Sequence, residues 1–181
     1  MRRVSMVGNS GSGKSTVGRA VAAALAVPYV EIDALYHQPG WQQLPAGELL
    51  AAVDSRTRGD GWVVDGNYSD ALDLVWSRAD TVVWLDLPRW LVMRQVGGRT
   101  ARRLGRREEL WNGNRGRLRA VLNPDPHQSI VRWAWTRHAM YAERYESRTG
   151  DPRWSGLDVV RLRSRADVDL FLGSLPQPPR R

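Results

Sequence analysis

Near its N-terminus the chain reads Gly8-Asn9-Ser10-Gly11-Ser12-Gly13-Lys14-Ser15-Thr16. This order fits the pattern G-x-x-x-x-G-K followed by Ser or Thr, the phosphate-binding loop known as Walker A. The apolar run at 3–7 predicts a buried strand before the loop, and apolar residues recur at helical spacing after it. The expected order is therefore strand, glycine loop and helix, which is the context that the motif requires.

The chemistry of a nucleotide site follows from this loop. Its three glycines let the backbone turn tightly, so successive N–H groups form an anion nest at the positive end of a helix dipole. We expect all nine residues, 8–16, to bind ATP, with Lys14 on the β- and γ-phosphates and the Ser15 hydroxyl on Mg²⁺. Lys14 is the only lysine in the chain. The alternative is a chance match in a glycine-rich turn.

Length and composition bound the class of protein. The 181 residues fit one compact domain, which we place at 1–175, followed by a disordered Pro-rich tail at 176–181. No apolar run is long enough to span a bilayer, and the chain enters a strand at once, which leaves no room for a signal peptide. Cysteine is absent, which excludes disulfides and thiolate metal sites. We therefore expect a cytoplasmic protein.

The chain is strongly basic, with 27 Lys and Arg against 19 Asp and Glu and a formal net charge of +8. This excess favours anionic partners such as nucleotides, phosphorylated acceptors or nucleic acid. Arginine in place of lysine, together with abundant Ala, Gly and Val, is also typical of a GC-rich coding bias. Basicity alone therefore does not choose among these partners.

Strands and helices are predicted to alternate along the rest of the chain. Further strands are expected at 29–32, 62–68, 81–87 and 158–162. Helices are expected at about 14–26, 45–58, 70–78, from 88 onward, at about 127–146 and from 164 onward, where the sequence resembles a capping box. This alternation predicts an α/β fold with a parallel sheet.

Asp33 is the first candidate outside the loop, because it follows the second predicted strand. Ligands of open parallel sheets bind beyond the carboxyl ends of the strands. We expect Asp33 to orient or deprotonate an acceptor hydroxyl, or to bind Mg²⁺ through water; the alternative is a helix N-cap. Tyr36, His37 and Trp41 follow as candidate wall residues of an acceptor region at about 33–60.

Asp65 is the second candidate carboxylate. It ends the apolar run Trp62-Val63-Val64, and an apolar strand that ends in aspartate is the Walker B arrangement. We therefore expect Asp65 to hold Mg²⁺ together with Ser15. The alternative is a turn aspartate before Gly66.

A basic segment separates the fourth and fifth predicted strands, with nine arginines between Arg94 and Arg119. One interpretation is a lid at about 99–126, whose Arg103 or Arg106 closes on ATP and neutralises charge in the transition state. The other interpretation is a nucleic-acid patch.

The pattern as a whole resembles the nucleoside-monophosphate-kinase and shikimate-kinase group of P-loop kinases. Within this group, four segments are similar to the adenylate-kinase-like proteins called topology modulation proteins: 33–35, 39–41, 62–68 and 84–89. The resemblance covers nearly the whole chain. It implies a three-layer fold with strand order 2-3-1-4-5 and transfer of the γ-phosphoryl group of ATP to a hydroxyl or phosphate acceptor.

Two features refine this resemblance. Residues 102–107 are similar to the Arg-x-x-Gly-Arg-Arg opening of the adenylate kinase lid. In contrast, Asn67-Tyr68-Ser69 stands where that family has Phe-Pro-Arg, and the second strand also lacks the arginine that grips AMP. These departures argue against AMP as the acceptor. We expect a monomer or homodimer that binds a nucleotide and an unidentified small molecule, and the alternative is an ATP-binding regulator that acts on DNA through its arginines.

Overall fold

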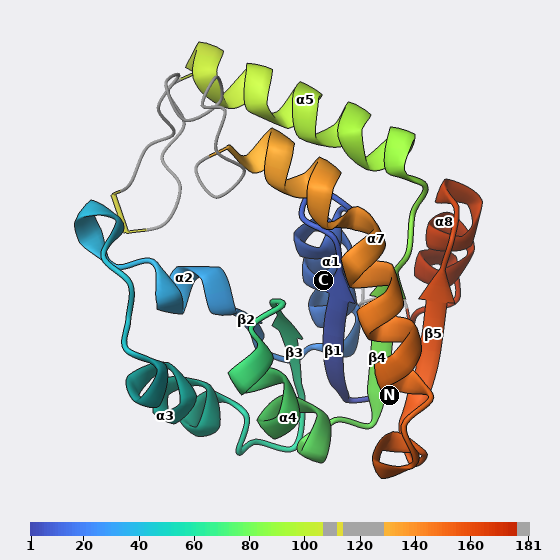
Figure 1. Cartoon of the computed structure of the whole chain (residues 1–181). Helices are drawn as coiled ribbons and strands as arrows, with labels where there is room; N and C mark the ends of the chain where they lie inside the picture. Colours follow the sequence, from blue (N-terminus) through green and yellow to red (C-terminus); the bar gives the residue numbers. More distant parts are fainter. Residues whose placement is uncertain (107–111, 114–128, 177–181) are drawn as a thin grey trace, which may run out of the picture.

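A computed structural model describes residues 1–106, 112–113 and 129–176. Its five strands form one parallel sheet in the order β2-β3-β1-β4-β5, as predicted (Figure 1). The strands are β1 (Arg3–Gly8), β2 (Tyr29–Glu31), β3 (Trp62–Asp65), β4 (Thr81–Leu85) and β5 (Asp158–Leu162).

The helices connect successive strands and cover the sheet. They are α1 (Lys14–Leu25), α2 (Ile32–Tyr36), α3 (Ala46–Arg56), α4 (Ser69–Arg78), α5 (Arg89–Arg106), α7 (Ile130–Thr149) and α8 (Arg165–Gly173). Two short 3₁₀ helices, η1 (Pro39–Trp41) and η2 (Pro152–Trp154), lie in connections. None of the helices in the described part of the chain is long and apolar enough to cross a membrane.

Two hydrophobic cores lie on opposite faces of the sheet, because successive strand side chains alternate between its faces. Val4 and Met6 of β1 face α1, where they pack with Val21. Val7 faces the other side, where α3, α4 and α7 contribute a core that contains Trp76 and Tyr145. The result is the predicted three-layer α/β fold.

The strand order reverses at β1, which pairs with β3 on one side and with β4 on the other. In open α/β sheets this switch point forms a crevice at the carboxyl ends of the strands. The loop that follows β1 and the residues that follow β3 therefore meet at one place. The candidate site lies there.

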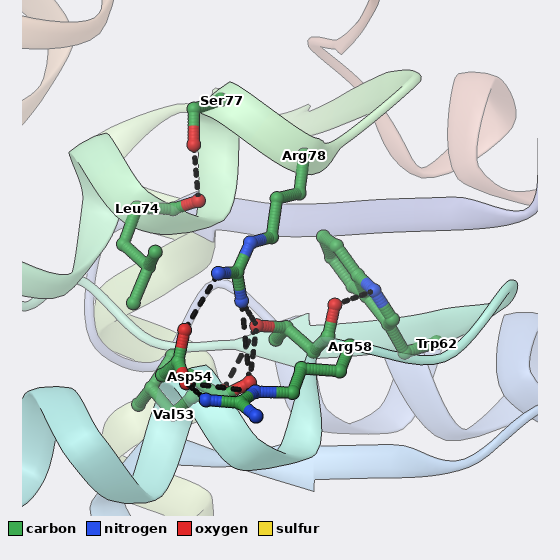
Figure 2. Close-up of polar contacts among 8 residues, drawn as sticks. Val53, Asp54, Arg58, Trp62, Leu74, Ser77 and Arg78 are labelled. Atoms are coloured by element: carbon green, nitrogen blue, oxygen red, sulfur yellow. Dashed lines mark hydrogen bonds and ion pairs between the residues drawn. The ribbon is translucent and has the colours of Figure 1, made fainter.

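Residues at the opposite end of β3 tie α3 to α4 (Figure 2). Asp54 accepts hydrogen bonds from Arg58 and Arg78, with Arg78 at 2.6 Å. Arg78 also donates to Thr57 Oγ1 at 2.9 Å, and Trp62 Nε1 donates to the Thr57 carbonyl at 3.1 Å. The guanidinium hydrogen bonds, from Arg78 first and then from Arg58, lower the pKa of Asp54. This polar cluster lies away from the switch point and stabilises the fold.

Several boundaries differ from those predicted. β2 ends at Glu31, and the chain turns at once into α2, whose first residue, Ile32, is fully buried in the core. α5 continues through Arg106, so the first part of the predicted lid is helical. The capping box is confirmed, since Ser164 Oγ accepts from the Asp167 N–H at 3.1 Å and the Asp167 carboxylate accepts from the Ser164 N–H.

Candidate nucleotide-binding site

The loop between β1 and α1 has a backbone that only glycine adopts without strain. Gly8, Gly11 and Gly13 have φ values of 139°, 82° and 96°. A Cβ atom on Gly8 would lie 2.5 Å from the Leu85 carbonyl oxygen, and one on Gly11 would overlap Val96 of α5. The loop therefore lies tightly between β4 and α5, which fixes the direction of its N–H groups.

Lys14 begins α1 and turns back over the loop. Its Nζ donates hydrogen bonds to the carbonyl oxygens of Gly8 at 2.9 Å and Asn9 at 3.0 Å. Burial lowers the pKa of Lys14, while the nearby carboxylates of Asp65 and Asp33 oppose this shift. A buried ammonium that faces carbonyl oxygens is well placed to exchange them for a phosphate anion.

Ser15 and Asp65, the residues predicted to hold Mg²⁺, are in direct contact. Ser15 Oγ donates to Asp65 Oδ2 at 2.7 Å, and Asp65 is only 4% exposed. The same oxygen accepts a hydrogen bond from the Tyr29 hydroxyl at 2.8 Å. The Walker B role of Asp65 stays a prediction, and the structure adds Tyr29, which the sequence did not indicate, as a partner of this carboxylate.

The oxygens of this pair suit magnesium. Mg²⁺ prefers hard oxygen ligands and is usually bound by one or two protein groups together with waters and substrate phosphates. No group of three or more His, Cys, Asp or Glu gathers within the described ranges. A metal at this place would thus depend on Ser15, Asp65 and the phosphates of a nucleotide, as in P-loop sites.

Asp33 lies in the first turn of α2 and not at the end of β2. It is not the N-cap, which is Glu31; its Oδ1 instead accepts from the Tyr68 hydroxyl at 2.8 Å. Burial raises the pKa of Tyr68, and the Asp33 carboxylate raises it further. The Asp33 carboxylate also opposes the lowering of the Lys14 pKa, so the two charges lie in the same region.

An aromatic row extends outward from this carboxylate. The ring of Tyr36 lies 4.7 Å from that of Tyr68 and 5.0 Å from that of His37, and Trp41 continues the row 5.4 Å from His37. Burial lowers the pKa of His37, against the opposing charge of Asp33, so its imidazole is neutral at pH 7. The predicted wall residues therefore lie together beside Asp33.

Comparisons with known proteins agree with this geometry. No family model matches the chain, and no curated protein matches it in sequence. Among solved structures, the shikimate kinase from Acinetobacter baumannii in complex with shikimate matches with a TM-score of 0.54 and 16% identity, over 94% of this chain and 88% of that one. The shikimate kinase from Bacteroides thetaiotaomicron gives 0.53 and 14%, over 95% and 94%. The shikimate kinase from Aquifex aeolicus gives 0.50 and 16%, over 95% and 94%.

The chain has the P-loop NTPase-like α/β fold of these structures. The similarity extends over nearly the full length of both partners, so it includes the sheet, the loop and the helices around the crevice. At identities of 14% and 16% it establishes the fold and leaves both the activity and the substrate open. The finer resemblance to adenylate-kinase-like topology modulation proteins stays a prediction.

The remaining loop residues of this fold have different surroundings. Asn9 is buried, and its Nδ2 donates to the Ala134 carbonyl of α7 at 2.8 Å, while its Oδ1 accepts from the Ser10 N–H. Ser12 Oγ is buried without a hydrogen-bond partner among the described residues, and Thr16 is exposed on α1. The Asn9 side chain thus connects the loop to α7. We therefore expect Asn9 to contact a nucleotide through its backbone.

Asn67 is a central residue that the sequence indicated only as a departure from the kinase pattern. Its Nδ2 donates to the Gly8 carbonyl at 2.7 Å, the same oxygen that accepts from Lys14. Its Oδ1 accepts from the Tyr145 hydroxyl of α7 at 2.9 Å. Because Asn67 and Tyr145 lie 78 positions apart, no local motif could have revealed this link.

α7 also supplies cations that the sequence did not place. Arg144 donates to the Oγ of Ser69, the residue after Tyr68, at 2.8 Å. The Arg137 guanidinium lies 4.9 Å from the centre of the Trp133 ring. This chain lacks the arginines that the adenylate kinase pattern has after the second and third strands, whereas Arg137 and Arg144 come from a distant helix. Burial raises the pKa of Tyr141, and the charges of Arg144 and Arg137 oppose this shift.

The predicted lid is only partly described. Arg103 and Arg106 lie in the last turns of α5, and their side chains lie outside what the structure describes. Residues 107–111 and 114–128, which make up most of the segment, also lie outside the described residues, as does most of the predicted tail. Asn112 is described, and its Nδ2 donates to the carbonyls of Ala34 and His37, so one point of the basic segment contacts α2.

Proposed function

We propose that the protein is an ATP-dependent small-molecule kinase, which transfers the γ-phosphoryl group to a hydroxyl or phosphate acceptor with Mg²⁺. The observation that carries this proposal is the convergence of Lys14, Ser15 and Asp65 at the start of α1. Asp33 lies on the other side of the same crevice. The fold similarity to shikimate kinases agrees with a phosphotransfer reaction.

In this proposal Lys14 and the loop amides hold the phosphates. Lys14 exchanges its two carbonyl partners for β- and γ-phosphate oxygens, which removes the mismatch between a buried cation and neutral partners. The N–H groups at the start of α1 add fixed partial charges that need no reorganisation during transfer.

Ser15 and Asp65 would hold the metal. When bound, Mg²⁺ would supply positive charge that offsets the charge developing on the phosphates. The Tyr29 hydroxyl keeps the Asp65 carboxylate oriented toward Ser15, because it donates to the oxygen that Ser15 also contacts. The three side chains come from β2, β3 and α1, so the sheet itself sets their separation.

Asp33 would accept the proton of an acceptor hydroxyl, or align that hydroxyl on the γ-phosphate. The hydrogen bond from Tyr68 holds one carboxylate oxygen and leaves the other for the acceptor. Such general-base assistance is typically worth about 10²–10⁴-fold, and the loose transition state of phosphoryl transfer favours the lower end. The alternative, an ATP-binding regulator that acts on DNA through the arginine-rich segment, draws no support from the comparisons.

An acceptor screen tests the proposal. ADP release from Mg²⁺-ATP would be measured against panels of nucleotides, sugars and hydroxylated organic acids, including shikimate, with the Lys14→Ala variant as the blank. The proposal predicts that at least one acceptor accelerates ADP release in the wild type and not in the variant. A protein that neither binds ATP nor turns it over with any acceptor would contradict it.

A further inference from the structure

Two tryptophans remain exposed on the outer surface of α5 and α7. Trp90 is 65% exposed and Trp135 is 53% exposed, whereas Trp62, Trp76 and Trp84 are almost fully buried. Large aromatic side chains left in water mark interaction sites when they gather in one region. Figure 1 shows that α5 and α7 lie side by side, and the buried contact between them includes Val96 and Ala134.

Arginines accompany both tryptophans. Trp90 and Arg94 are four residues apart on α5, and Arg132 and Trp135 are three apart on α7, so each pair shares a helix face. The guanidinium of Arg89 lies 5.1 Å from the centre of the Trp135 ring, which links the two helices. We call Arg89, Trp90, Arg94, Arg132 and Trp135 the tryptophan–arginine face.

This face contains a shallow hollow of about 350 Å³. It is lined by Met93, Val131, Arg132, Trp135 and Thr136. Its lining is largely apolar, with one arginine and one indole at its margin. A flat heterocycle of the size of a nucleobase fits a hollow of this kind, because stacking needs one apolar surface and an adjacent cation.

The charge of the face is uncompensated. Residues 89–106 and 130–142 include no Asp or Glu. Arg89, Arg94 and Arg132 are exposed, and within the described part of the chain none of the three makes an ion pair. In contrast, Arg161 is paired with Asp86 and Arg153 with Asp151. The face is therefore complementary to a partner with regularly placed negative charges.

We propose that the tryptophan–arginine face binds single-stranded nucleic acid. Its bases stack on Trp90 and Trp135, and its phosphates contact Arg89, Arg94 and Arg132. A duplex keeps its bases stacked inside and offers none to the indoles. A second copy of this chain would bring two cationic faces together, which like charges oppose, and a flat lipid surface would leave the hollow unfilled.

The proposed strand site is separate from the proposed ATP site. α5 turns Val96 toward Gly11 of the loop, whereas Trp90 and Arg94 lie on its exposed side. Binding of the strand should therefore continue at saturating Mg²⁺-ATP. This inference does not depend on the kinase proposal, and either can fail alone.

Fluorescence anisotropy with a labelled oligo(dT) tests the inference. A length of about 15 nucleotides is near the upper end of the site sizes known for one single-strand-binding fold. Trp90→Ala and Trp135→Ala should each weaken binding about 5- to 150-fold, the range for loss of one stacked base. With three phosphate contacts, the slope of log K against log salt should be about −2, and Arg132→Gln should reduce it by about 0.7. Matched controls are Leu170→Ala and Arg56→Gln, which change an exposed apolar side chain and an exposed arginine elsewhere.

Four results would overturn the inference. Wild-type affinity in both tryptophan variants would show that the face is not used, and equal binding of a duplex of the same length would exclude base stacking. Competition by ATP would place the strand in the nucleotide site. If the protein did not bind oligo(dT) but bound vesicles rich in phosphatidylserine, the face would be assigned to lipid. If it did not bind oligo(dT) but formed a dimer that the tryptophan variants lose, the face would be assigned to a second copy of the chain.

Discussion

Asn67→Ala should separate nucleotide affinity from stability, because the Gly8 carbonyl has two side-chain donors in this structure, Lys14 and Asn67. In the free protein, loss of Asn67 leaves Lys14 on that oxygen. When Lys14 turns to the phosphates of ATP, Asn67 becomes the remaining side-chain donor. The substitution should thus destabilise the nucleotide complex more than it destabilises the free protein.

The magnitude follows from the cost of an unpaired buried acceptor, about 1–3 kcal/mol. Gly8 is buried between β4 and the loop, so this range applies and corresponds to roughly 5- to 150-fold weaker ATP binding. Calorimetric titration of Mg²⁺-ATP would measure the affinity, and thermal unfolding of the free protein would measure the stability.

Tyr145→Phe is the matched control, because it removes the other partner of Asn67. It leaves the Asn67 Oδ1 unpaired but keeps the hydrogen bond to Gly8, so it should lower the melting temperature and leave ATP affinity almost unchanged. If Asn67→Ala lowered only the melting temperature and bound ATP like the wild type, the reasoning would be refuted, and Asn67 would be a structural link to α7 alone.

Three further changes follow from the same structure. Asp33→Asn should keep ATP affinity and lower the transfer rate about 10²-fold or more; if the rate were unchanged, Asp33 would have no part in transfer. Gly11→Ala should abolish ATP binding and lower the melting temperature, since φ is 82° and the added Cβ overlaps Val96, and Val96→Ala should restore only part of the loss because the backbone strain remains. Asp54→Asn tests the pKa of Asp54, which its arginine partners hold below the usual 3.8. A carboxylate with a lowered pKa stabilises the fold above the unfolded-state value and loses that effect as pH falls through the folded-state value. The melting temperatures of wild type and Asp54→Asn should therefore differ at pH 7 and converge in acid, whereas a constant difference would show that the ion pairs do not contribute.

The nucleotide-binding half of the site could be predicted from the sequence because its spacing is local. The loop, Lys14 and Ser15 lie within nine consecutive residues, and the strand before them is a short apolar run. A nearly continuous apolar run likewise indicated β4, since a strand buried on both faces needs such a run. The pairing of Asp65 with Ser15 was expected because an apolar strand that ends in aspartate is the Walker B arrangement.

The other half of the site depends on contacts between distant elements. The bonds of Asn67 to Tyr145 and of Arg144 to Ser69 join residues more than 70 positions apart, and no periodicity specifies them. Asp33 follows the second strand as predicted, but it lies within a helix, α2, that the sequence did not indicate. Local pattern gives the type of element, whereas packing decides where the element begins.

The most direct test of the nucleotide site is the affinity of the wild type and Lys14→Ala for Mg²⁺-ATP, measured by calorimetry without an acceptor. Lys14 makes its hydrogen bonds to carbonyl oxygens as a buried cation, and a charged hydrogen bond is worth about 1.5–3 kcal/mol. The account predicts one bound nucleotide in the wild type and at least about tenfold weaker binding in the variant, with a similar melting temperature of the free proteins. Equal affinities in the two proteins, or no binding in the wild type, would contradict it.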